Sequence, residues 1–114
     1  MSKSDKRPWG KREIFLEESD YKVKRITVFP GHRLSYQKHA QRKEHWMFVA
    51  GEGKVTLESE VVAVSKNSII DIEIGMAHRV ENVGSVDLVF IELQMGSYLG
   101  EDDIERLEDD YGRK

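Results

Sequence analysis

The chain has 114 residues, of which 39% are hydrophobic and 34% are charged, and its formal net charge at pH 7 is −3. This length and composition predict one compact domain over residues 1–114, and the mild acidity gives no support for nucleic-acid binding. The chain has no cysteine, which excludes disulfides and thiolate chemistry. The N-terminus lacks the apolar core of a signal peptide, and no apolar run approaches the roughly 20 residues that cross a bilayer. We therefore expect a cytoplasmic protein that binds neither membranes nor nucleic acid.

Short β-rich segments follow one another along most of the chain. In the first of them, Lys22–Phe29, we expect Val23, Ile26 and Val28 to point inward, with one phase slip near Lys24-Arg25. Trp46 and Phe48 are predicted to lie in the core. Regularly spaced strands of this kind predict a sandwich or a barrel. The other predicted strands are Trp46–Ala50, Lys54–Glu58, Val61–Val64, Ser68–Ile72, His78–Glu81 and Val86–Met95.

One segment, Glu101–Asp110, has the pattern of a helix. Ile104 and Leu107 are three residues apart, and acidic residues crowd the start, where the helix dipole favours negative charge. We expect a short C-terminal helix whose acidic side chains face solvent.

Four polar side chains are spaced so that they could bind one cation. Gln37 and His39 are two residues apart, so on a strand they point to the same face. Glu44 follows after a short polar break, and His78 comes from a second hairpin after the turn at Gly75. Two imidazoles, an amide oxygen and one carboxylate suit a divalent Zn, Fe, Mn, Co or Ni ion.

The two stretches that carry these residues resemble the paired signatures of the cupin superfamily. The first keeps the spacing from Gly31 through His39 and Glu44 to Gly51, with Gln37 in the place of the usual first histidine. In the second stretch Gly75, His78 and Asn82 match, whereas Asn67 and Glu73 replace a glycine and a proline. The resemblance implies an all-β fold, the cupin double-stranded β-helix, which is a small antiparallel β-barrel.

A closer resemblance, from about Arg7 to Arg113, is to the type II mannose-6-phosphate isomerase cupin. In that family the cupin often forms the C-terminal half of a bifunctional enzyme with a mannose-1-phosphate guanylyltransferase, and we expect this chain to be the isomerase module alone. Ala40 and Gln41 replace two histidines that usually follow the glutamine. The matching segments are RPWG (7–10), YKVKRITVFPG (21–31), LSYQKHAQRKEHW (34–46), HRVENVG (78–84) and YLGEDDIERLEDDYGR (98–113).

The resemblance implies interconversion of mannose 6-phosphate and fructose 6-phosphate through an enediol. One divalent metal ion, with zinc as the first choice, would stabilise the enediolate oxygens. Arg42 and Arg79 each lie beside a ligand group and are expected to anchor phosphate or stabilise charge. His45 and a water held by the metal are both candidates for the base. The cations of Lys22–Arg25 are either a solvated edge or part of a phosphate site.

Two other functions remain open at this point. A non-catalytic cupin that binds a sugar or a sugar phosphate would be consistent with Ala40 and Gln41 in place of histidines. A metal-dependent oxygenase would use His39, His78 and Glu44 as a facial triad, with Gln37 idle. In each case exposed strand edges give a physical motive for a homodimer.

Overall fold

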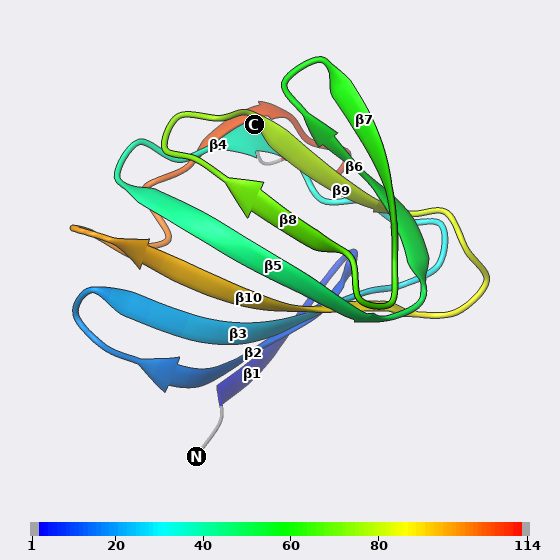
Figure 1. The fold of residues 1–114 in the computed structure, drawn as a ribbon, viewed down its shortest axis with the longest axis horizontal. Coiled ribbons are helices and arrows are strands. Elements are labelled where there is room, and N and C mark those ends of the chain that lie inside the picture. Colours follow the sequence, from blue (N-terminus) through cyan, green and yellow to red (C-terminus); the bar gives the residue numbers. More distant parts are fainter. Residues whose placement is uncertain (1–2, 113–114) are drawn as a thin grey trace.

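A computed structural model, which describes residues 3–112, contains eleven β-strands in two antiparallel sheets (Figure 1). The first sheet has the strand order β1-β2-β3-β10-β5-β8 and the second the order β11-β4-β9-β6-β7. No helix occurs in residues 3–112, so this part of the chain offers no helix that could span a membrane. The strands are β1 Lys3–Arg7, β2 Gly10–Glu17, β3 Tyr21–Val28, β4 Tyr36–Lys38, β5 Arg42–Ala50, β6 Glu52–Leu57, β7 Glu60–Ser65, β8 Ile69–Ile72, β9 His78–Asn82, β10 Leu88–Gly96 and β11 Glu105–Glu108.

The core lies between the two sheets and is built around three aromatic rings. Trp46 stacks on Phe90 with ring centroids 4.5 Å apart, and Phe48 lies 4.9 Å from the same ring. All three side chains are buried, as predicted for Trp46 and Phe48. Their packing fixes β5 and β10 as neighbours at the centre of the first sheet.

The inward faces of β3, β10 and β5 are apolar at one end and polar at the other. From Lys22 to Ile26 in β3 the alternation is unbroken, with Lys22 and Lys24 buried and Val23 on the opposite side, so the phase slip predicted near Lys24-Arg25 is wrong. The register aligns the polar ends, because Lys24 lies opposite Glu92, and Gln94 lies opposite Glu44. The inward residues, from apolar to polar, are Val28, Ile26, Lys24 and Lys22 in β3, Leu88, Phe90, Glu92 and Gln94 in β10, and Phe48, Trp46, Glu44 and Arg42 in β5.

The helix predicted over Glu101–Asp110 is wrong, because Glu105–Glu108 forms β11 and pairs with β4. Residues 97–104, which we call the arm, connect β10 to β11 without regular structure. The Asp103 carboxylate accepts hydrogen bonds from the backbone N–H groups of Ala40 and Gln41, both at 3.0 Å. Tertiary partners of this kind override the weak helical pattern. The arm is thereby fixed to the turn that precedes β5.

Candidate metal centre and its cavity

The polar ends of the strands enclose a cavity of about 240 Å³. Its wall draws on the β1–β2 hairpin, β3, β4, β5, β9, β10, the arm and β11, so segments far apart in the sequence meet here. Five cationic side chains line it, against three carboxylates and two histidines. The cations are Arg7, Arg12, Lys24, Arg42 and Arg106, and the carboxylates are Glu44, Glu92 and Glu101.

Three of the four predicted ligands converge in this cavity. One ligand atom from each of His39, Glu44 and His78 lies within 4.8 Å of the others. His39 follows β4, Glu44 belongs to β5, and His78 begins β9, so both sheets contribute. All three side chains are buried. A cluster of two imidazoles and one carboxylate shielded from water is a donor set suited to a first-row divalent metal.

The surroundings of His78 and Glu44 leave donor atoms available to a metal, and His39 has a nitrogen without a partner. His78 Nδ1 is 3.0 Å from the carbonyl oxygen of Met76, to which it can donate, leaving the lone pair on Nε2. Trp46 Nε1 donates to Glu44 Oε1 at 2.9 Å and orients that carboxylate. His39 Nδ1 is buried, has no hydrogen-bond partner and lies 3.7 Å from Glu44 Oε2. A buried nitrogen with no partner is costly, and a metal ion would satisfy it. The residues present therefore fit a metal.

The electrostatics of the three groups also fit a metal site. Burial lowers the pKa of His39 to about 4 and lowers the pKa of His78, so both imidazoles are neutral at pH 7. Burial alone would raise the pKa of Glu44, but the nearby His78 and Arg42 hold it below its usual range. Neutral imidazole and ionised carboxylate are the forms that bind metal.

The fourth predicted ligand, Gln37, lines the same cavity from β4. Its backbone pairs with that of His78, which brings β4 and β9 together at the cavity. Its amide is half-buried. Its role as a ligand stays a prediction.

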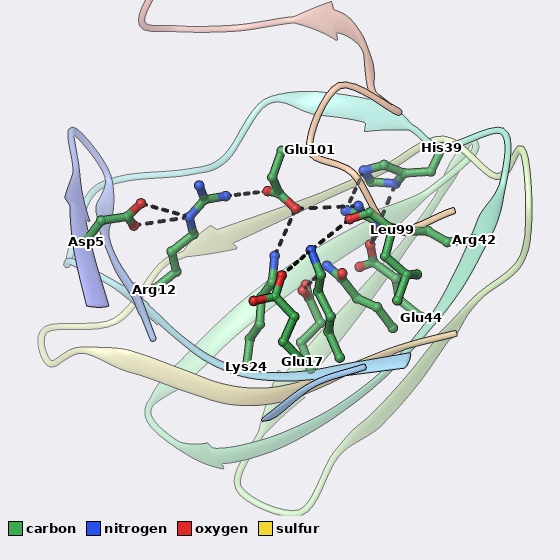
Figure 2. Close-up of polar contacts among 12 residues, drawn as sticks. Asp5, Arg12, Glu17, Lys24, His39, Arg42, Glu44, Leu99 and Glu101 are labelled. Atoms are coloured by element: carbon green, nitrogen blue, oxygen red, sulfur yellow. Dashed lines mark hydrogen bonds and ion pairs between the residues drawn. The ribbon is translucent and has the colours of Figure 1, made fainter. Parts of the chain in front are cut away.

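Arg42 lies in the cavity wall beside the ligand group, as Figure 2 shows. Its Nε donates to Glu44 Oε2 at 2.9 Å, and its Nη2 is 2.9 Å from His39 Nε2. Its Nη1 is buried without a hydrogen-bond acceptor and lies 3.7 Å from Glu101 Oε2. The predicted arginine is thus the group that connects the candidate ligands to the rest of the cavity.

Arg79 and His45, the other two predicted catalytic residues, do not line the cavity. Each follows a ligand directly in a strand, so its side chain points to the opposite face. Arg79 donates to the carbonyl oxygen of Leu34 at 2.9 Å and to Glu108 at 3.2 Å, which ties β9 to β11. His45 is 47% exposed on the outer face of the first sheet, 2.6 Å from Asp71.

The wall contains charged residues that the sequence did not mark as functional. They include Arg12, Glu92 and Glu101. Lys24 also lines the cavity, and the sequence alone assigns it either to a solvated edge or to a phosphate site. A usable signal was present in β3 and β10, where a polar residue takes an inward position next to apolar ones. No such signal exists for Arg12 or Glu101, because the β1–β2 hairpin and the arm carry no apolar alternation.

Glu92 and Glu101 differ sharply in their environment. Burial and the neighbouring Glu44 raise the pKa of Glu92 to about 8, and its carboxyl group accepts a 2.6 Å hydrogen bond from Gln94. Burial opposes ionisation of Glu101 as well, but Lys24 and Arg12 lower its pKa to about 2. At pH 7 the cavity therefore has a clear excess of positive charge, which suits an anionic ligand.

Known proteins with similar sequence identify the family. The family model described as "Mannose-6-phosphate isomerase C-terminal" matches residues 1–109, so the chain belongs to this family. Mannose-1-phosphate guanylyltransferase ManC from Salmonella typhimurium strain LT2 is 50% identical over 107 residues, which is 94% of this chain and 22% of that protein. The chain thus spans less than a quarter of the length of this relative.

Solved structures confirm the predicted cupin fold. The capsular polysaccharide assembling protein CapF from Staphylococcus aureus superposes with a TM-score of 0.83 at 24% identity, over 95% of this chain and 34% of that one. A Klebsiella pneumoniae protein with a double-stranded β-helix domain superposes with a TM-score of 0.75 at 20% identity, covering 86% and 84% of the two chains. The all-β double-stranded β-helix is therefore correct, apart from the C-terminal helix.

Proposed function

We propose that the chain is a metal-dependent isomerase that interconverts mannose 6-phosphate and fructose 6-phosphate. The observation that carries the proposal is the buried group of His39, Glu44 and His78 in a cavity lined by five cations. Isomerisation of a sugar phosphate needs both features. The cations would bind the anionic phosphate, and a metal in the buried group would stabilise the negative charge that develops on the enediolate. Membership of the family supports this choice of substrate.

The metal, with zinc as our first choice, would be held by His39, Glu44 and His78, with Gln37 as a fourth, weaker ligand. When bound, it would supply positive charge to the oxygens of the enediolate. Arg42 would extend this positive charge from the ligand group toward the cations farther along the wall, and these cations together would hold the phosphate. Remote binding of this kind orients the reacting carbons.

Proton transfer between C2 and C1 has to use a group that reaches the substrate. His45 is on the outer face, so it does not suit this role. With Glu44 and both histidines serving as ligands, the titratable carboxyl groups left in the described wall are Glu92 and Glu101. Glu101 is paired with Lys24 and Arg12, so Glu92 is the candidate among the carboxyl groups. Loss of turnover in Glu92→Gln would assign the proton to Glu92, and retained turnover would point to a water held by the metal.

A non-catalytic sugar-phosphate-binding protein is the second candidate, because Ala40 and Gln41 replace histidines of the family. Both residues are exposed in the turn before β5, and neither lines the cavity. Their replacement leaves the cavity wall intact, which favours the enzyme. An oxygenase would use the same ligands, and oxygen uptake after addition of iron tests that function.

The deciding experiment is a coupled isomerase assay of the purified protein after chelation and after return of zinc, cobalt or manganese. We expect activity to be lost on chelation and restored by metal in the wild type, but not in His39→Ala/His78→Ala. The His45→Ala variant is the matched control and should behave as the wild type. Metal-loaded wild type that binds mannose 6-phosphate without interconverting it would support the binding protein instead.

A further inference from the structure

Three cations from three strands meet at one carboxylate of the arm (Figure 2). Lys24 Nζ of β3 lies 3.1 Å from Glu101 Oε2, and Arg42 Nη1 of β5 lies 3.7 Å from the same oxygen. Arg12 of β2 donates from Nη1 to Glu101 Oε1 and from Nε to Asp5 Oδ1. A single carboxylate therefore stands where three positive side chains converge.

One carboxylate does not satisfy these cations fully. Lys24 is only 2% exposed, so its ammonium group cannot turn to water. Arg42 Nη1 points toward Glu101 but is too far away to donate a hydrogen bond, and it is buried. A phosphate monoester offers three terminal oxygens and up to two negative charges, which matches three cations better than one carboxylate does.

Glu101 can leave this position without unfolding its surroundings. The arm is anchored on both sides of it, since Lys22 Nζ donates to the carbonyl oxygen of Leu99 at 2.9 Å and Asp103 binds two backbone N–H groups. The Glu101 side chain itself is 43% exposed. A rotation about its own bonds brings the carboxylate into solvent while the arm stays attached.

The cluster of Arg12, Lys24 and Arg42 also lies close to the candidate ligands. Arg42 spans the distance, with Nε on Glu44 and Nη1 directed at Glu101. Building on the function proposed above, we propose that Arg12, Lys24 and Arg42 form the phosphate subsite, and that Glu101 occupies it in the free protein. A sugar phosphate has to displace the Glu101 carboxylate before its phosphate can bind, so the arm competes with the ligand.

The test is calorimetric titration of inorganic phosphate into wild type and Glu101→Gln, repeated in EDTA to separate binding by these cations from binding through a metal. Removal of the competing charge should tighten phosphate by about tenfold. The matched control is Glu105→Gln, which changes the net charge equally; Glu105 is 64% exposed, faces Lys38 and does not line the cavity. This control should leave phosphate affinity unchanged.

Adding Arg12→Gln to Glu101→Gln should reverse the gain. Equal phosphate affinity in wild type and Glu101→Gln, or a gain that survives Arg12→Gln, overturns the proposal. In the wild type, phosphate should also shift the carboxyl carbon resonance of Glu101 and leave that of Glu105 in place; an unmoved Glu101 signal overturns it as well. Neither phosphate affinity nor the Glu101 resonance depends on turnover. A protein without isomerase activity would therefore contradict only the proposed isomerase function, and a Glu101 resonance that does not move with phosphate would contradict only the subsite.

Discussion

Arg42 contacts two of the three groups proposed to bind metal, and elementary imidazole chemistry limits what it can do there. A neutral imidazole has one nitrogen with a lone pair and one that carries a proton. Arg42 Nη2 needs the lone pair of His39 Nε2, which lies 2.9 Å away. A metal needs a lone pair on the same ring, whichever nitrogen it uses. Metal binding to neutral His39 therefore has to release Arg42 from that ring.

This competition makes a prediction about Arg42→Ala. The variant should bind metal at least as tightly as wild type, because a competing cation is gone, whereas kcat/KM should fall by an amount equivalent to about 2 kcal/mol or more. A competition titration with a coloured chelator measures the first quantity and the isomerase assay the second. Loss of metal from Arg42→Ala would contradict the competition and assign Arg42 a supporting role in the ligand group.

The ligand assignment predicts a graded response to single substitutions. His39→Ala and His78→Ala should each abolish stoichiometric metal, because each removes a buried donor from a cluster with few alternatives. Gln37→Ala should only weaken binding, since an amide oxygen is the poorer ligand. Elemental analysis after dialysis measures the outcome, with His45→Ala as the matched histidine control. Full occupancy in the His39→Ala/His78→Ala double variant would rule the site out.

At the scale of elements, the sequence predicts a strand correctly where one face of that strand is apolar. It does not predict a strand whose two faces are both polar. The run from Trp46 to Ala50 alternates against a core, and it lies in β5. The β1–β2 hairpin and β4 contain mostly polar residues, so no period marks them. In the arm and β11, Ile104 and Leu107 have the three-residue spacing of a helix. The structure of this segment is instead set by contacts with Ala40, Gln41 and β4, which are distant in the sequence.

The β1–β2 hairpin approaches β3 most closely at Gly10. A Cβ at Gly10 would lie 1.9 Å from the carbonyl oxygen of Thr27 in β3, which no side chain tolerates. We expect Gly10→Ala to lower the free energy of unfolding by about 2–4 kcal/mol, measured by urea denaturation. The control is Gly84→Ala, where the nearest atom would be 3.5 Å away. Equal stability of both variants would show that the hairpin can move aside freely.

We expect the free energy of unfolding to depend on pH through the Glu101 carboxylate of the arm. Burial opposes its ionisation, but Lys24 and Arg12 lower its pKa to about 2, below the usual 4.5. The ionised form thus stabilises the folded chain; this contribution is present above pH 4.5 and is lost as the pH falls toward 2. The difference in unfolding free energy between wild type and Glu101→Gln should shrink from pH 6 to pH 3, measured by urea denaturation. A difference that stays constant over this range would mean that Glu101 is not paired in solution.

For the whole molecule, motif spacing predicted that His39, Glu44 and His78 converge, but it did not predict the cavity around them. His39, Glu44 and His78 are fixed by the positions of turns and strands, which leave a trace in the sequence. The cationic wall needs the register between β3 and β10 and the path of the arm, because Lys24 meets Glu101 across 77 residues of chain. Long-range pairing of this kind has no local pattern from which it could be predicted.

The outer face of the first sheet carries exposed apolar side chains through which two molecules could associate. Met47, Val49 and Ile69 are 38%, 40% and 53% exposed on β5 and β8, with Met47 and Ile69 directly opposite each other. Ile91 of β10 lies opposite Met47 on the other side. Contiguous apolar side chains on a surface favour association, and two copies of one such face suit a two-fold axis.

We therefore predict a homodimer that buries this outer face. Met47→Lys should convert it to a monomer, because a charge at the centre of an apolar interface loses its hydration without gaining a partner. Light scattering coupled to gel filtration measures the mass, and Val61→Lys, the same kind of change at an exposed position of β7 in the second sheet, is the control. The cavity opens on the other face of β5, so Met47→Lys should keep its metal and its isomerase activity. A wild-type protein with the mass of one chain would contradict the prediction, and a dimer that withstands Met47→Lys would move the interface to another face.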